Sequence, residues 1–405
     1  MQNAIVNAKH AMGLAGEKMN KTTKTIYLDN AATTAVDEKV VKAMMPYFSE
    51  KYGNASSVHH MGFEAKEALD KSREIIAKSI NAEPGEIYFT SGGTESNNLA
   101  LKGIIFANPE KKHIITTKIE HACVLNTCKW LNEEGIDVTY VEVDKNGFVN
   151  PKDIEILIRE NTALVSVIHG HNEIGTIQNI EKIGEICKRK GVYFHIDACQ
   201  SYMKTDIDVK KQNLDLVTLN SHKIHGPKGV GALYVRKGIK IEPLQHGGGQ
   251  EKAVRSGTEN ISGIVGFAEA VKLHKKDDVK KMEKLRDNLI KGILKIQNTK
   301  LNGPKENRLC NNVNVSFNNI EGEALSGYLN DYGICVSTGS ACSSKSLEPS
   351  YVLRAIGLTH LQANSSIRLS ISRFTTESEI DYTLKILNKV VGQLREISPF
   401  KNEEY

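Results

Sequence analysis

Seven short apolar runs alternate with longer amphipathic patterns over the first two thirds of the chain. This alternation predicts a mostly parallel β-sheet, because a parallel strand needs a crossover segment, usually a helix, before the next strand begins. The sequence therefore predicts an α/β lobe with one seven-stranded sheet between helices. The expected strands are Glu86–Thr90, His113–Thr117, Val138–Val143, Ala163–Ile168, Val192–Asp197, Leu214–Leu219 and Gly231–Val235.

The pattern changes after about Gly266, where a Lys-rich amphipathic stretch runs to Gln297. Shorter strands and helices follow, and they predict a smaller α+β lobe joined to the first by a continuous helix. The division we expect is an N-terminal extension at 1–25, a large domain at 26–270 and a small C-terminal domain at 271–405. The first residues of the large domain are expected to pack on the small one. The expected elements of the small lobe are strands at Asn312–Phe317, Ile334–Ser337 and Ile367–Ser372 and helices at Glu321–Tyr332 and Glu377–Ile397.

Composition narrows the class of protein. The 405 residues are 40% hydrophobic and carry a formal charge of +5, which is too slight to indicate nucleic-acid binding. Seven cysteines, without a Cys-x-x-Cys pair, argue against a disulfide framework or a structural zinc site and favour a reducing compartment. No apolar stretch is long enough to span a bilayer and no signal peptide is evident. We therefore expect a cytoplasmic enzyme acting on a small molecule.

Three segments carry residues that suit chemistry. The first is a strand followed by a glycine-rich turn and a helix, in which Gly92, Gly93 and Thr94 form a candidate phosphate cradle. Taken alone, this loop fits equally a strand–helix turn that requires only small residues. The second and third segments are apolar strands that deliver Asp197 and Lys223 near their carboxyl ends, where ligands bind in open α/β sheets.

These three segments together fit pyridoxal phosphate. That cofactor needs a lysine for its aldehyde, a carboxylate for its ring nitrogen and an anion cradle for its phosphate. Asp197 and Lys223 are one strand–helix–strand unit apart, so they can face the same crevice. A desolvated lysine can form a Schiff base.

In these and further motifs the chain resembles the class V, fold-type-I pyridoxal-phosphate enzymes, and within them the NifS/IscS-like cysteine desulfurases. The resemblance extends from Ile26 to about Phe400. The matching stretches, in order, are Tyr27-Leu-Asp-Asn-Ala-Ala-Thr-Thr, Ser91-Gly-Gly-Thr-Glu-Ser-Asn-Asn, Glu120-His, Asn172-Glu-Ile-Gly, His195-Ile-Asp-Ala-Cys-Gln, Ser221-His-Lys-Ile-His-Gly-Pro-Lys-Gly, His246-Gly-Gly-Gly-Gln-Glu, Arg255-Ser-Gly-Thr, Ser337-Thr-Gly-Ser-Ala-Cys and Ser366-Ile-Arg-Leu-Ser-Ile-Ser-Arg-Phe-Thr-Thr.

The resemblance implies roles around the cofactor ring. Lys223 would form the Schiff base and act as acid and base, while Asp197 would pair with the ring nitrogen. His121 would stack on the ring and take part in catalysis. Asn172 and Gln200 would hydrogen-bond the ring substituents, with Asn172 also near the substrate.

The resemblance also implies the phosphate and substrate ligands. Arg373 would clamp the carboxylate of L-cysteine, a bidentate geometry that suits a guanidinium group. The expected phosphate ligands are Gly93, Thr94, Asn220, His222 and, from the second subunit of a homodimer, Thr258. The family commonly has Ser where this chain has Asn220, and Asn in place of His171, so the phosphate contact of Asn220 is left open.

Cys342 would be the nucleophile that takes sulfur from L-cysteine, leaving alanine and a persulfide. It lies in a run of small polar residues that predicts a surface loop. No resident metal is expected, apart from a transient iron–sulfur contact of Cys342. Cys335 is expected in the core, and Cys199 as a packing residue near the cofactor.

Two other readings stay open. A selenocysteine lyase or another aminotransferase-like enzyme would share this fold. A non-catalytic sulfur-relay or assembly scaffold would keep the fold for binding, although the presence of both Lys223 and Cys342 argues against it. The sequence does not identify the sulfur acceptor, for which an iron–sulfur scaffold protein is the expected partner, and no membrane or nucleic-acid partner is expected.

Overall fold

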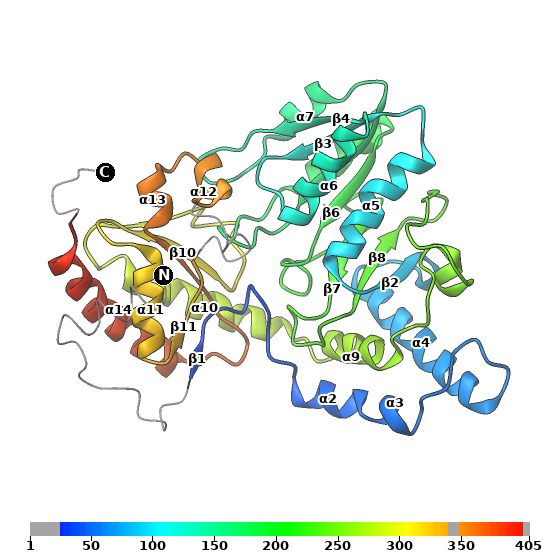
Figure 1. Cartoon of the computed structure of the whole chain (residues 1–405), viewed down its shortest axis with the longest axis horizontal. Coiled ribbons are helices and arrows are strands. Elements are labelled where there is room, and N and C mark those ends of the chain that lie inside the picture. The colour runs from blue at the N-terminus through cyan, green and yellow to red at the C-terminus, as the bar shows by residue number, and fades with distance from the viewer. Residues whose placement is uncertain (1–24, 339–347, 400–405) are drawn as a thin grey trace.

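A seven-stranded sheet forms the centre of the larger lobe in the computed structural model, which describes residues 25–338 and 348–399 (Figure 1). The strand order is β2-β8-β7-β6-β5-β3-β4, and β8 runs antiparallel to both neighbours. The mostly parallel sheet expected from the sequence is confirmed. Its strands are β2 (Ile87–Thr90), β3 (His113–Thr117), β4 (Asp137–Val141), β5 (Thr162–Ile168), β6 (Tyr193–Asp197), β7 (Leu216–Asn220) and β8 (Gly231–Val235).

Helices cover both faces of this sheet. Successive strand residues point to opposite faces, and the packing follows: Leu164 joins one apolar cluster with α5 and α6, whereas Val165 joins another with α4, α8 and α9. This two-sided burial explains why most of the strands are rich in apolar residues. The helical segments of the lobe are α2 (Glu38–Met44), α3 (Pro46–Ser49), α4 (His60–Ser79), α5 (Gly93–Ala107), α6 (Ala122–Glu133), α7 (Pro151–Leu157), α8 (Ile180–Lys190) and α9 (Ile261–Lys272), with 3₁₀ turns η1 (Pro84–Glu86) and η2 (Gln250–Ala253).

The smaller lobe lies on the left of Figure 1. Strands β9 (Thr299–Leu301), β10 (Asn312–Phe317) and β12 (Ser366–Ser370) form an antiparallel sheet, and β1 (Ile26–Tyr27) pairs in parallel with β11 (Ile334–Cys335). Ile26 and Leu28 pack in this lobe's core. The remaining helices are α10 (Lys276–Ile293), α11 (Gly322–Asp331), α12 (Tyr351–Ala355), α13 (His360–Asn364) and α14 (Glu377–Ile397).

The prediction of a continuous helix between the lobes is wrong. α9 ends at Lys272 and α10 begins at Lys276, and Lys275 between them has an extended backbone with φ −129° and ψ 137°. The apolar residues of α9 pack in the core of the large lobe, whereas those of α10 pack in the core of the small lobe. The apolar residues on either side of the break therefore belong to two helices, each of which packs in the core of a different lobe. We keep the domain division at about residue 270 as a proposal that these two cores support.

The expected N-terminal extension lies almost wholly outside the described residues, which begin at residue 25. Across the described ranges, no helix combines the length and apolar character needed to cross a membrane.

Candidate active site

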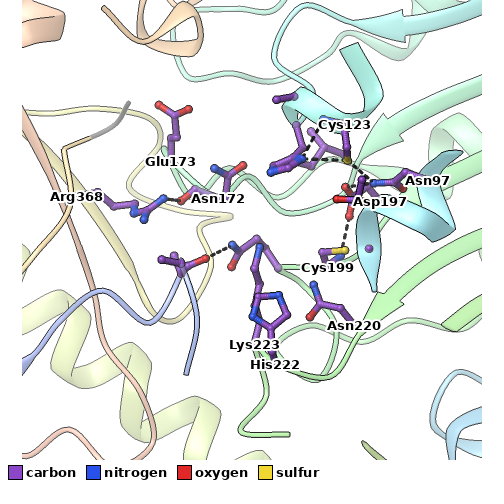
Figure 2. Close-up of a pocket in the computed structure, with 18 of the residues that line it drawn as sticks. Asn97, Cys123, Asn172, Glu173, Asp197, Cys199, Asn220, His222, Lys223 and Arg368 are labelled. Atoms are coloured by element: carbon purple, nitrogen blue, oxygen red, sulfur yellow. Dashed lines mark hydrogen bonds between the residues drawn. The ribbon is translucent and has the colours of Figure 1, made fainter. Parts of the chain in front are cut away.

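Three neighbouring parallel strands end at one cavity of about 270 Å³ (Figure 2). Ile168, Asp197 and Asn220 are the last residues of β5, β6 and β7, and all three line the cavity. The carboxyl ends of parallel strands meet at one edge of a sheet, which is why residues so far apart in the sequence converge here.

Asp197 is buried, with an exposed fraction of 3%. Its Oδ1 accepts a hydrogen bond from the backbone N–H of Cys199 at 2.9 Å, and its Oδ2 accepts from Nδ2 of Asn97 at 2.8 Å. Burial acts to raise the pKa of Asp197, but the charge that His121 carries in the acid range, together with these donors, holds the pKa below its ordinary value. The cavity therefore contains an ionised carboxylate.

The glycine-rich turn leads into α5, whose first two residues, Gly93 and Thr94, line the cavity. Gly92 precedes them with φ of +152°, a conformation that favours glycine. A Cβ on Gly93 would lie 2.4 Å from Sγ of Cys199, so only glycine fits at this close approach. The N-terminus of α5 thus presents backbone N–H groups to an anion.

Lys223 follows β7 and lines the same cavity together with Asn220 and His222. Nζ of the neighbouring Lys204 donates to the backbone carbonyls of Gln200 and Lys223, at 2.9 and 3.2 Å. Lys204 therefore ties the backbone of Lys223 to the loop after β6. Burial lowers the pKa of Lys204 to about 8 and that of His222 to about 4.

His121 caps the N-terminus of α6, where its Nδ1 accepts from the backbone N–H of Cys123 at 3.2 Å. Asn172 and Gln200 also line the cavity, and Nε2 of Gln200 donates to the carbonyl of Ala31 at 2.8 Å. The structure thus brings together most of the residues that the sequence analysis singled out.

The placement of Arg373 contradicts the role expected for it. Arg373 does not line the cavity that holds Asp197; its guanidinium pairs instead with Asp37 and contacts the carbonyl of Leu273. Arg373 follows the end of β12 in the small lobe, and its contacts with Asp37 and Leu273 join the two lobes; with Lys223 it lines a second, smaller pocket.

Arg368, five residues earlier on β12, occupies the position expected for Arg373. It lies on the side of the cavity opposite Asp197 (Figure 2). Its Nη2 donates to Asp29 at 2.8 Å and its Nη1 to the carbonyl of Asn172 at 3.2 Å. Nε of Arg368 is buried without a partner among the described residues, and so leaves a charged donor for a ligand.

One expected residue does not line the cavity. Thr258 is exposed on the segment between η2 and α9 and does not line it. Cys342 lies outside the described residues. Cys335 was expected in the core but is half-buried; across the described ranges its strand, β11, pairs with β1 alone. Cys199 is buried beside Asp197 and lines the cavity, as expected for a packing residue near the cofactor.

Sequence reasoning missed several cavity residues. Asn97 lies one helical turn after Gly93, a spacing that places both on one face of α5 and could have revealed it. No sequence signal marks Cys123. Glu173 accepts from Oγ of Ser350 at 2.6 Å, and burial raises its pKa to about 7. In the described part of the chain, no group of three or more His, Cys, Asp or Glu side chains is arranged to hold a metal ion.

The sequence and the fold of the chain are similar to those of known proteins. The sequence profile of the family described as "Aminotransferase class-V" matches residues 26–383. A protein named cysteine desulfurase IscS from Methanosarcina thermophila is 51% identical over 394 residues, which cover 96% of this chain and 98% of that protein. A namesake from Clostridium botulinum is 50% identical over 393 residues, covering 94% and 99%. A solved structure titled "NIFS-LIKE PROTEIN" superposes with a TM-score of 0.86 at 42% identity, covering 92% of this chain and all of that one.

The fold and the site define a fold-type-I, pyridoxal-phosphate-dependent enzyme. The chain belongs to the class-V aminotransferase family and, within it, to the NifS/IscS-like group.

Proposed function

We propose that the chain is a homodimeric cysteine desulfurase, which converts L-cysteine to L-alanine and transfers the sulfur to Cys342 as a persulfide. One observation carries the proposal: a single cavity contains Lys223, the ionised Asp197 and an anion cradle at the N-terminus of α5. The identity of about half to proteins named cysteine desulfurase supports the choice of substrate.

The cavity residues fit pyridoxal phosphate. A Cβ would not fit at Gly93, and the Nδ2 donor of Asn220 lies 3.7 Å from the position that this Cβ would take, beside the N-terminus of α5. Asn220 can offer its amide N–H to a phosphate oxygen in place of the usual serine. When bound, the cofactor supplies an aldehyde for an amine and a ring that accepts negative charge from the substrate α-carbon.

The lining of this cavity also supports the following roles around the cofactor ring. Lys223 would bind the aldehyde and move protons, and Asp197 would hold the ring nitrogen protonated. His121 would lie against the ring, with Asn172 and Gln200 as hydrogen-bond partners of its substituents. The phosphate would be bound by Gly93, Thr94, Asn220, His222 and the partner subunit's Thr258.

For the substrate carboxylate we propose Arg368 in place of Arg373. Its unpartnered Nε and its position opposite Asp197 support this choice. A guanidinium binds a carboxylate in a fixed orientation, so Arg368 would place the substrate α-carbon between itself and the carboxylate of Asp197.

Cys342 is proposed as the nucleophile because both flanks of its segment reach the site. The backbone of Ser337 pairs with that of Arg368, at 3.1 and 2.7 Å, and Ser350 lines the cavity. The reaction balances: the C–S bond of cysteine breaks, sulfur joins the Cys342 thiol, and the substrate carbon gains a hydrogen.

A homodimer is proposed from one surface. Several large apolar side chains between positions 45 and 63 are mostly exposed, and two of them, Val58 and Phe63, line one cleft with Gln250 and Glu259, which lie on either side of Thr258 in the sequence. Exposed apolar patches of this kind mark interfaces, and a second copy of the chain would cover it and bring Thr258 to the other cavity. The exposed apolar residues are Met45, Phe48, Tyr52, Val58 and Phe63.

We also propose that the sulfur passes to an acceptor protein such as an iron–sulfur scaffold, and that the protein is cytoplasmic. The relatives named IscS support the first proposal, and the free cysteines among the described residues support the second.

Product analysis tests the function. We expect alanine and sulfide in equal amounts from L-cysteine with a thiol reductant present. Selenide from selenocysteine under the same conditions, without alanine from cysteine, would instead support a selenocysteine lyase. Keto-acid formation without loss of sulfur would support an aminotransferase, and no product from either amino acid would support a scaffold.

A further inference from the structure

A series of hydrogen bonds connects Asp197 to His121 through Asn97 and Cys123 (Figure 2). Nδ2 of Asn97 donates to Oδ2 of Asp197 at 2.8 Å and to Sγ of Cys123 at 3.1 Å. Sγ of Cys123 lies 3.0 Å from Nδ1 of His121. All four residues line the cavity.

The direction of the Asn97 bonds follows from the charge of Asp197. An ionised carboxylate only accepts hydrogen bonds, so the amide nitrogen of Asn97 must face it. The two amide hydrogens then serve Asp197 and Cys123, while Oδ1 of the fully buried Asn97 has no partner among the described residues. The Cys123 sulfur is therefore an acceptor toward Asn97, and its S–H is available to donate elsewhere.

The state of the His121 ring follows from a backbone amide. The N–H of Cys123 donates to Nδ1 of His121 at 3.2 Å, and an amide N–H can only donate. Nδ1 therefore carries the lone pair, and a neutral ring has its proton on Nε2. The Cys123 thiol is directed at the same lone pair. Burial raises the pKa of Cys123 to about 12, so the thiol keeps the proton that it donates.

The surrounding charges are compatible with a neutral ring. Burial and the amine of Lys223, which follows β7, lower the pKa of His121, whereas Asp197 at the end of β6 raises it. The net direction is below the ordinary value. His171 also faces this region, and burial lowers its pKa to about 4, so it adds no positive charge near neutral pH.

We propose that Cys123 is a positioning residue whose thiol, with its own backbone N–H, holds His121 in the neutral tautomer protonated on Nε2. His121 then presents an N–H donor, and not a lone pair, to a ligand in the cavity. Asn97 holds the thiol in place and connects it to Asp197. This inference deepens the proposed function. Only its consequence for the reaction, that His121 donates a hydrogen bond to the bound molecule, rests on that function.

Nitrogen NMR of the purified protein with ¹⁵N-labelled histidine tests the tautomer directly, and His121→Gln identifies the signal. We expect an unprotonated Nδ1 and a protonated Nε2 at neutral pH, with protonation of the ring only below the ordinary histidine pKa. Cys123→Ala removes one donor to the neutral ring, so the pKa of His121 rises by about half a unit to one unit. Cys123→Ser keeps a donor, so the pKa of His121 in this variant should stay close to its wild-type value.

Cys128→Ala is the matched control, because Cys128 is buried on the same helix but packs in the apolar cluster between α5, α6 and the sheet. It should leave the His121 signal unchanged. A wild-type ring protonated on Nδ1, or an unchanged His121 titration in Cys123→Ala, overturns the proposal. The wild-type spectrum decides the tautomer even where a variant does not fold. Absence of alanine formation together with the expected spectrum would instead overturn the proposed function.

Discussion

Replacing Arg368 with lysine should weaken substrate binding much more than the same change at Arg373. Lysine keeps the positive charge but lacks the planar fork of donors, so it loses the N–H that Nε leaves free for a carboxylate. One hydrogen bond to a charged group contributes about 1.5–3 kcal/mol. At 1.36 kcal/mol for each factor of ten, kcat/KM should fall by about 10- to 150-fold.

The assay is the initial rate of alanine formation over a range of L-cysteine concentrations, with bound cofactor measured by its absorbance. Arg373→Lys is the matched control: it disturbs the pair with Asp37 outside the cavity, so its KM should stay within about twofold of the wild type. The reasoning is refuted if Arg373→Lys raises KM strongly while Arg368→Lys does not. That result would restore the role first expected for Arg373.

Two further substitutions test the site, and a third tests the buried carboxyl of Glu120. Lys223→Ala should still bind the cofactor noncovalently, since the phosphate cradle is intact, but slow alanine formation on the order of 10³-fold or more; near-normal turnover would exclude Lys223 as the reactive amine. Asp197→Asn removes the charge beside the ring nitrogen and should slow turnover on the order of 10²-fold, whereas an unchanged rate at saturating cysteine would leave Asp197 only a cap. Burial raises the pKa of Glu120 to about 8, so the stability that its protonated form contributes is present below about pH 4.5 and is lost as pH rises through 8. Thermal scans should therefore show a larger loss of Tm between pH 6 and 9 in the wild type than in Glu120→Gln, and equal losses would contradict the buried carboxyl.

Much of the fold could be predicted because burial leaves a simple pattern. The strands at 113–117, 231–235 and 312–317 match the structure at both ends, since each contains at least two β-branched or aromatic residues, which favour strands. The break at Lys275 could not be predicted, because amphipathic periodicity continues across it while the core that the apolar face meets changes.

The site was predictable where one strand end delivers one residue. Asp197 is the last residue of β6 and Lys223 comes three residues after the end of β7, and these two strands are neighbours in the sheet, which brings the two residues together. The two arginines differ only in where β12 ends, which neither spacing nor residue type indicates. Cys123 enters the site because it lies in the first turn of α6, which His121 caps, so its role depends on tertiary structure.

The most direct test is to expose the protein briefly to L-cysteine, trap thiols by alkylation and locate added sulfur by mass spectrometry. The proposal predicts one extra sulfur atom on the peptide that contains Cys342, formed together with alanine. Both signals should vanish in Cys342→Ser while the bound cofactor keeps its absorbance. Extra sulfur on Cys123, Cys199 or Cys335, or full alanine formation by Cys342→Ser, would contradict the account.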